Sequence, residues 1–154
     1  LAPLLPPLIL IQAIPKRSIL DFIIQKGTEL GVSKFYLYPS QRSEKKTLSE
    51  NHLNRLHHIL VASIKQCGRL HLPTIEMGFP KLDIPLFFGS LSKTAPLLIT
   101  KKRLPAALVI GPESGFTDQE NEELEKKGVG VRLGPYVLRT ETAALSGLSI
   151  LANS

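Results

Sequence analysis

Two glycine-proline loops near the C-terminus constrain the fold more than any other part of the sequence. Residues 110–116 read I-G-P-E-S-G-F, and residues 133–143 read L-G-P-Y-V-L-R-T-E-T-A. Each loop follows a run of aliphatic residues typical of a buried strand and leads into a helical pattern. Successive strand-loop-helix units place their loops at one edge of a parallel sheet, where open α/β sheets bind ligands. The sequence therefore predicts a ligand site formed by both loops.

The remaining composition indicates one soluble domain. The 154 residues are 43% hydrophobic, and no apolar run approaches the length of about 18 residues that indicates a membrane span. The apolar start, residues 1–11, lacks the basic region of a signal peptide. The single cysteine, Cys67, excludes an intrachain disulfide, and the four histidines do not form a metal-ligand pattern. We expect a cytoplasmic protein without a metal site or a membrane partner.

Positive charge is concentrated in the first two thirds of the chain. Residues 1–112 hold 15 Lys and Arg against 6 Asp and Glu, a net +9, whereas residues 113–154 hold 4 against 7, a net −3. Such a potential attracts a polyanion such as RNA, although many basic proteins bind no nucleic acid. The basic residues that we expect to contact RNA are Arg42, Lys45, Lys46 and Arg69.

Capping residues and periodicity predict helices that alternate with strands. A first helix ends at Gly31, and a second begins at the N-cap Ser49 and ends at Gly68. The sequence T-D-Q-E at residues 117–120 is a capping box, and Thr140 is the expected N-cap of the last helix. The second helix has an expected apolar face and an expected solvent face. The apolar face contains Leu53, Leu56, Leu60, Ile64 and Cys67, and the solvent face contains His52, Arg55, His58 and Lys65.

Short apolar runs predict five strands, at residues 34–38, 74–77, 96–100, 106–110 and 129–133. Their alternation with helices indicates a mostly parallel sheet with helices on both faces. No repeat and no interdomain linker interrupts residues 1–154, so one domain is expected.

The two loops offer different chemistry. Gly111 and Gly115 allow the backbone to approach a ligand closely, although a tight structural turn would explain the same residues. Arg139, at the end of the second loop, remains charged at physiological pH and is suited to hold a phosphate or stabilise a developing anion. An ion pair between Arg139 and Glu141 or Glu113 is the alternative, and it is compatible with the first role.

These segments resemble the RsmE family, bacterial enzymes that methylate N3 of a uridine in 16S ribosomal RNA with S-adenosylmethionine. The family pattern is approximately I-G-P-E-G-G-F followed by L-G-x-R-I-L-R-x-E-T-A. Upstream, Q-K-G-T-E-L-G-V at residues 25–32 and Q-C-G-R at residues 66–69 are similar to further family motifs. Two residues depart from the pattern: Ser114 replaces a glycine and Tyr136 an arginine. The G-P-Y-V-L segment is, however, similar to the G-D-Y-V-L cofactor loop of the tRNA guanine-N1 methyltransferases.

The resemblance implies an α/β fold of the SPOUT type, in which the C-terminus forms a deep trefoil knot. It also implies a homodimer with the last helix at its interface. Members of the family carry an N-terminal RNA-binding barrel similar to the PUA domain, ahead of the segment where this chain begins. We therefore expect residues 1–154 to correspond to the SPOUT methyltransferase domain alone.

The resemblance further implies that backbone and side chains of both loops bind S-adenosylmethionine, with a third wall after Ile99. Arg139 is the expected catalytic residue, and Glu141, Glu113 or water would accept the uridine proton. Two alternatives remain: a knotted RNA methyltransferase with another target, such as a tRNA ribose 2′-oxygen, and a non-catalytic RNA-binding or dimerisation module. The cofactor-binding residues implied are Thr100, Ile110, Gly111, Pro112, Glu113, Gly115, Leu133, Gly134, Tyr136, Val137, Leu138 and Thr140.

Overall fold

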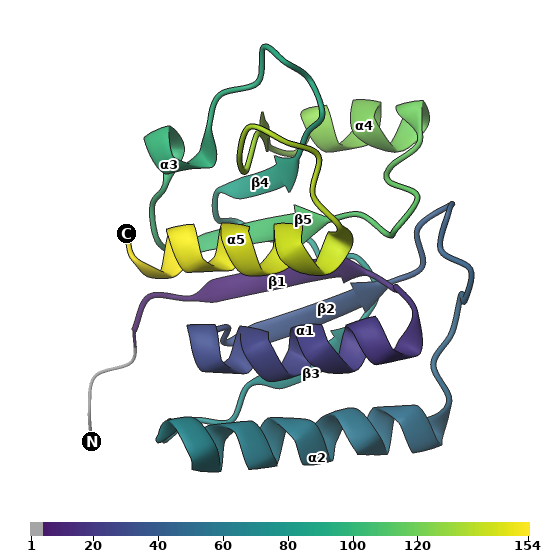
Figure 1. The fold of residues 1–154 in the computed structure, drawn as a ribbon, viewed down its shortest axis with the longest axis vertical. Helices are drawn as coiled ribbons and strands as arrows, with labels where there is room; N and C mark the ends of the chain where they lie inside the picture. The colour runs from purple at the N-terminus through teal and green to yellow at the C-terminus, as the bar shows by residue number, and fades with distance from the viewer. Residues whose placement is uncertain (1–4) are drawn as a thin grey trace.

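Six parallel strands form one sheet in the order β3-β2-β1-β5-β4-β6 in the computed structural model, which describes residues 5–154 (Figure 1). The first four residues of the apolar start therefore lie outside the described part. The strands are β1 (Leu8–Ala13), β2 (Lys34–Tyr38), β3 (Thr74–Met77), β4 (Leu86–Gly89), β5 (Ala106–Ile110) and β6 (Val129–Val131). The helices are α1 (Arg17–Leu30), α2 (Glu50–Cys67), α3 (Leu98–Lys101), α4 (Asp118–Glu125) and α5 (Thr140–Ala152).

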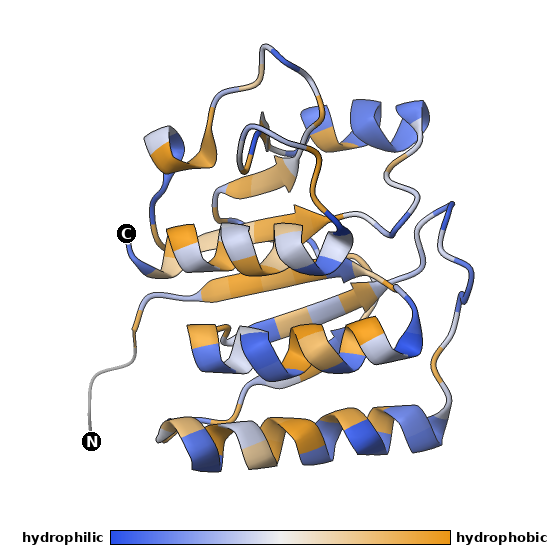
Figure 2. Ribbon diagram, in the orientation of Figure 1, coloured by the Kyte–Doolittle hydropathy of each residue, from blue (hydrophilic) through white to orange (hydrophobic). Residues whose placement is uncertain are grey.

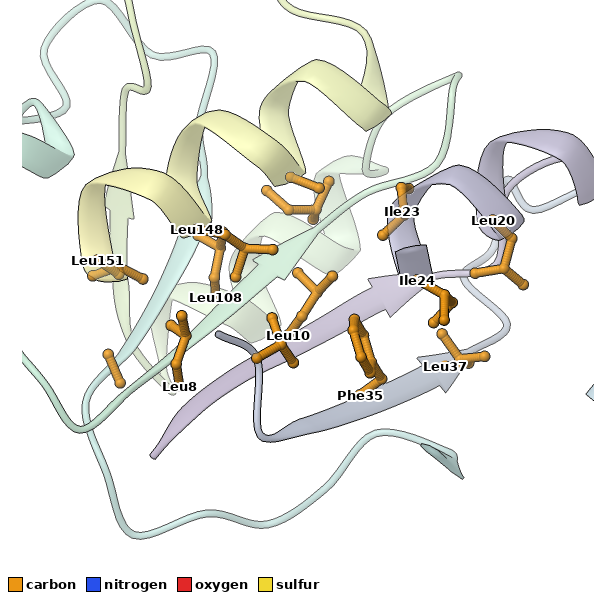
Figure 3. Packing of buried hydrophobic residues seen from close by; sticks show 14 of the residues in the cluster. Leu8, Leu10, Leu20, Ile23, Ile24, Phe35, Leu37, Leu108, Leu148 and Leu151 are labelled. Carbon is orange, nitrogen blue, oxygen red and sulfur yellow. The ribbon is translucent and has the colours of Figure 1, made fainter. Parts of the chain in front are cut away.

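Helices cover both faces of the sheet, as predicted. On one face α1 and α5 pack on the central strands, with Leu10, Leu108 and Leu148 in the shared core (Figure 3). On the other face Leu124 of α4 belongs to a cluster with Phe88 and further strand residues. All residues of β1 and β5 are buried, and both strands are hydrophobic along most of their length in Figure 2. This burial explains their continuous apolar sequences.

The predicted ends of the helices are confirmed at several positions. Gly31 and Gly68 end α1 and α2 with φ angles of 106° and 80°, a left-handed conformation that favours glycine. Ser49 Oγ accepts a hydrogen bond from the backbone N–H of His52 at the start of α2. Thr117 and Glu120 form the complete capping box of α4. Capping residues close in sequence were therefore sufficient to predict these helix boundaries.

The strand predicted at residues 96–100 is wrong. The segment forms the short helix α3 and makes one parallel bridge, between Leu97 and Arg132. The place beside β5 is taken by β4, which pairs with β5 from Leu86 to Phe88. A short apolar run fits a buried helix and a buried strand equally well. The sequence does not predict strands β1 and β4. Strand β1 follows a proline-rich start, and β4 lies in a stretch rich in proline and phenylalanine.

The predicted faces of α2 are also partly wrong. His52 is buried and Cys67 is exposed. Because α2 packs on α1, its buried stripe is narrow, and it contains His52, Leu56, Leu60 and Ser63. The imidazole of His52 lies 3.1 Å from a carboxylate oxygen of Asp21 on α1, which gives the buried ring a polar partner.

The C-terminal segment crosses the sheet between its last two elements. Strand β6 pairs with β4 at the edge, and the chain then runs to α5, which packs on β5, β1 and α1 (Figure 1). On the way, the bridge from Arg132 to Leu97 joins it to the β4–β5 connection. A knotted C-terminus requires such a crossing, and the trefoil threading itself stays a prediction.

Candidate functional site

Three loops enclose a cleft of about 710 Å³ at the carboxyl ends of β4, β5 and β6. The loops are residues 89–93, 110–116 and 131–138. Eleven of the twelve residues predicted to bind a cofactor line this cleft. They are Ile110, Gly111, Pro112, Glu113, Gly115, Leu133, Gly134, Tyr136, Val137, Leu138 and Thr140. A cleft is therefore present at the edge of the sheet where the sequence predicts a ligand site.

The structure does not place Thr100, the twelfth residue, in the cleft. Its hydroxyl donates to the carbonyl oxygen of Leu97 within α3 at 2.7 Å, and its side chain is exposed. The third wall is formed instead by the loop after β4, which runs from Gly89 to Lys93. The sequence L-F-F-G-S, an aromatic run stopped by glycine and serine, is the signal that identifies this wall.

The first loop is held by local contacts that favour its glycines. Gly115 has a φ of 77° and donates its N–H to the carbonyl oxygen of Pro112 at 2.9 Å. A Cβ on Gly111 would lie 3.3 Å from the ring of Phe116, tighter than ordinary contact. Ser114 does not adopt a positive φ. The replacement of a glycine by Ser114 therefore adds no backbone strain.

Arg42 reaches this loop from the segment after β2. Its Nη1 donates to the carbonyl oxygens of Ser114 and Phe116, at 2.9 and 3.3 Å. The neighbouring Gln41 accepts a hydrogen bond from the hydroxyl of Thr117 at 2.9 Å. Arg42 also lines the cleft. A residue predicted to contact RNA therefore contributes to the wall of the site.

Thr140 does not cap the last helix as predicted. Arg139 occupies the N-cap position, and Thr140 is the first residue of α5. The Thr140 hydroxyl instead donates to the carbonyl oxygen of Gly111 at 2.6 Å and accepts from the side-chain amide of Gln12 at 3.0 Å. Gln12 was not predicted at all. Its signal is a polar residue inside the apolar run of β1, L-I-L-I-Q-A.

The second loop leaves large apolar side chains in solvent at the mouth of the cleft. Tyr136 is 82% exposed and Val137 is 78% exposed. Gly134 faces open space, because a Cβ there would meet no atom within 4 Å. Exposed apolar groups beside an open backbone are typical of a surface that a ligand covers.

The two predicted catalytic residues lie in different surroundings. Arg139 is exposed at the start of α5, and among residues 5–154 it forms no ion pair with Glu113 or Glu141. Glu141 lines a hollow between α1 and α5, outside the cleft. Glu113 does line the cleft, and its Oε2 accepts a hydrogen bond from the backbone N–H of Lys16 at 2.9 Å.

The basic residues predicted to contact RNA are likewise divided. Lys45 and Lys46 are exposed in the same segment as Arg42. Arg69 follows α2, at the amino-end edge of β2, and donates to the carbonyl oxygens of Val32 and Thr28 at 2.8 and 2.9 Å. Burial lowers the pKa of its guanidinium. Arg69 is therefore a structural link between α2 and α1, and the structure does not bring it to the cleft.

Two further features bear on the class of site. In the described part of the chain, no three His, Cys, Asp or Glu side chains are grouped as a metal site. Within residues 5–154, no helix has the length and apolar character required to span a bilayer.

Comparisons with known proteins agree with this geometry. Ribosomal RNA small subunit methyltransferase E of Bacillus subtilis is 32% identical, over 90% of this chain and 62% of that protein. Its counterpart in Buchnera aphidicola is 29% identical, over 91% of this chain and 60% of that protein. The crystal structure of the Neisseria gonorrhoeae enzyme of this name, bound to S-adenosyl methionine, superposes with a TM-score of 0.82. It is 28% identical, over 96% of this chain and 66% of that chain.

The chain thus spans less than two thirds of the two curated relatives and 66% of the solved chain. The likeness to the solved enzyme confirms the SPOUT-type α/β fold. The sequence-family model described as the RNA methyltransferase domain matches residues 3–85 and 87–152 of this chain. Because this match extends over nearly the whole chain and the cleft lies where the two glycine-proline loops meet, the chain belongs to the RNA methyltransferase domain family.

Proposed function

We propose that this domain transfers a methyl group from S-adenosylmethionine to N3 of a uridine in 16S ribosomal RNA of the small subunit. The observation that carries the proposal is the cleft itself, in which eleven residues predicted from the loop motifs meet at the ends of three parallel strands. Relatives named for small-subunit ribosomal RNA methylation and the cofactor bound to one of them support the same reaction. A ribosomal substrate implies action in the cytoplasm.

The cleft fits this cofactor in size and in chemistry. Its volume of about 710 Å³ lies within the range of about 300 to 1,000 Å³ found for small-molecule sites. Apolar side chains such as Leu91, Leu133 and Leu138 suit an adenine ring, and Glu113 offers a carboxylate to a positively charged group. When bound, S-adenosylmethionine supplies an electrophilic methyl group on a sulfonium centre.

Side chains of the domain would stabilise the negative charge that develops on the uridine and accept its N3 proton. Loss of the uridine N3 proton spreads negative charge onto the two flanking carbonyl oxygens, and Arg139 would stabilise that charge through fixed electrostatics. The proton acceptor is Glu113, Glu141 or water. Glu113 is favoured over Glu141 because it lines the cleft, whereas Glu141 faces the hollow between α1 and α5.

RNA would approach across the segment after β2, where Lys45 and Lys46 are exposed beside the cleft residue Arg42. Arg42 bonds two backbone carbonyls, and the ammonium of Lys46 likewise donates to the carbonyl oxygens of Ser40 and Gln41. The exposed side chain of Lys45 is suited to neutralise a phosphate. This division assigns phosphate contact first to Lys45 and support of the first glycine-proline loop to Arg42.

We further propose that the domain acts as a homodimer through α1 and α5. A hollow of about 610 Å³ between these helices is lined by apolar groups that include Phe22, Leu30 and Leu145. Phe22 is 41% exposed. A second copy packed on this hollow would remove these groups from water.

Calorimetric titration with S-adenosylmethionine tests the cofactor, and nucleoside mass spectrometry after incubation with small ribosomal subunits tests the product. The proposal requires saturable binding and 3-methyluridine. A 2′-O-methyl nucleoside would contradict the assigned position and favour another knotted RNA methyltransferase. Absence of cofactor binding would contradict the proposal and favour a non-catalytic module.

A further inference from the structure

Gln12 lies beneath the cleft, where three separate parts of the chain meet. Its side chain is 0% exposed. Its amide nitrogen lies 3.0 Å from Thr140 Oγ1, 3.0 Å from the carbonyl oxygen of Ala13 in its own strand, and 3.4 Å from the carbonyl oxygen of Gly111. Thr140 donates to that same carbonyl. One buried amide therefore joins β1 to the loop after β5 and to the start of α5.

We infer that Gln12 is a positioning residue that sets the relative placement of the two glycine-proline loops for cofactor binding. The inference rests on the proposed function, because it gives Gln12 a role in holding S-adenosylmethionine. Gln12 itself does not line the cleft. It acts through Gly111 and Thr140, which do.

Peptide geometry explains how a buried amide shapes the surface above it. The Gly111–Pro112 peptide bond is trans. In a trans peptide, the carbonyl oxygen points away from the atom that takes the place of the amide hydrogen, which in proline is Cδ. Holding the Gly111 oxygen toward Gln12 and Thr140 therefore turns the Cδ side of the Pro112 ring away from them, and Pro112 lines the cleft. Because proline has no N–H, the ring is what this peptide presents to a ligand.

The same network fixes the end of the second loop. Thr140 directly follows Arg139, so an anchored Thr140 also anchors the backbone from which the proposed catalytic side chain extends. Gly111 and Thr140 are 29 positions apart in sequence and belong to different elements. Their contact makes the two loops one unit rather than two independent walls.

The other atom of the Gln12 amide argues that the residue is not present for stability alone. Among the described residues, Oε1 of Gln12 is the buried side-chain polar atom without a hydrogen-bond partner. Burying an unpaired acceptor is unfavourable, and an apolar side chain of similar shape would avoid it. A purely structural position would favour methionine or leucine here. We therefore assign the role of Gln12 to its amide nitrogen, which donates toward Thr140 and Gly111 as well as to Ala13 in its own strand.

Gln12→Met tests the inference, because it keeps the length of the side chain and removes both polar atoms. The dissociation constant for S-adenosylmethionine, measured by calorimetry, is expected to rise about fivefold to tenfold, since the loops lose a shared donor. The midpoint of thermal unfolding is expected to change by less than about 3 °C or to rise, because the unpaired Oε1 is also removed. A structural role alone would lower both affinity and stability.

Two further variants complete the design. Thr140→Val removes the hydroxyl at the other end of the network. In the double variant with Gln12→Met, the fold-loss of affinity for S-adenosylmethionine should be smaller than the product of the fold-losses in the two single variants. Gln66→Met makes the same chemical change at an exposed position near the end of α2, and it should leave affinity unchanged.

Amide hydrogen exchange gives a readout that does not depend on the cofactor. Exchange at Gly115 and Ala143, whose N–H groups bond to Pro112 and Arg139, should be faster in Gln12→Met than in the wild type. Unchanged exchange at both amides, or multiplicative losses in the double variant, would overturn the inference. If the wild type failed to bind S-adenosylmethionine, the proposed function would fall, and exchange at the two amides would still decide the role of Gln12.

Discussion

The guanidinium of Arg42 lies 2.9 Å from the carbonyl oxygen of Ser114, so a charged residue from the segment after β2 supports the loop after β5. The contact joins residues 72 positions apart. Hydrogen bonds that involve a charged partner are stronger than neutral ones, although exposure to solvent weakens this pair.

Arg42→Ala should loosen this loop and raise the dissociation constant for S-adenosylmethionine about threefold to tenfold. Calorimetric titration measures the change. Arg103→Ala, which removes an exposed arginine before β5, is the matched control and should bind as the wild type does. Equal affinities for both variants would show that the Arg42 contact does not support cofactor binding.

Arg139→Ala should reduce methyl transfer to ribosomal RNA by about 100-fold or more, the usual effect of losing a donor that stabilises a developing anion. The dissociation constant for the cofactor should change little, because the Arg139 side chain does not line the cleft. Single-turnover transfer of a radiolabelled methyl group separates the two effects. Transfer within about threefold of the wild-type rate would contradict the catalytic role.

Glu113→Gln should slow methyl transfer more than Glu141→Gln does, because only the first carboxylate of this pair lines the cleft. The glutamine keeps an acceptor for the N–H of Lys16 and removes the basic oxygen. Rates measured across a pH series provide the comparison. The reverse order of effects would move the proton acceptor to Glu141, and equal small effects would favour water.

Phe22→Asp should shift the protein from dimer to monomer, because it places a charge on the hollow between α1 and α5. Sedimentation equilibrium measures the change in mass. Leu70→Asp makes a similar change at a residue that is 78% exposed at the amino-end edge of the sheet, and it should leave the mass unchanged. A monomeric wild-type protein would contradict the dimer at once.

Tyr38 should make the free energy of unfolding depend on alkaline pH. Burial, with a smaller contribution from Glu120, raises the pKa of its phenol. The folded protein therefore holds this proton more tightly than the unfolded chain, in which tyrosine titrates near pH 10. The stabilisation is complete below about pH 10 and decreases as the pH rises above it. Urea titrations from about pH 9 to 11 should show that the free energy of unfolding decreases less in Tyr38→Phe than in the wild type. The same decrease in both proteins would contradict the assignment to Tyr38.

The sequence predicted the place of the cleft because both loops carry their information locally. A glycine-proline pair after an aliphatic run predicts a strand end, and the capping box at Thr117 predicts the helix that follows. These signals depend on neighbouring residues alone. The parallel sheet follows from the alternation of such units.

Long-range pairing explains what the sequence could not predict. Residues 96–100 carry a strand-like composition, yet β4 occupies the place beside β5, so the segment forms α3 and Thr100 lies outside the cleft. Thr140 looks like a cap from its neighbours alone, but its hydroxyl has a better partner in Gly111, which only the folded sheet brings near. His52 is likewise buried where α2 packs on α1, and its ring lies 3.1 Å from a carboxylate oxygen of Asp21.

Helix α5, the last element of the chain, completes the core over β1 and β5. Its residues Ala144, Leu148 and Leu151 are 0% exposed and belong to the same cluster as Leu10 and Leu108. The central strands therefore lack part of their cover on this face until α5 has packed on them. Because β1 spans Leu8–Ala13 and α5 spans Thr140–Ala152, closure of this core depends on contacts between residues far apart in sequence, and such contacts slow folding.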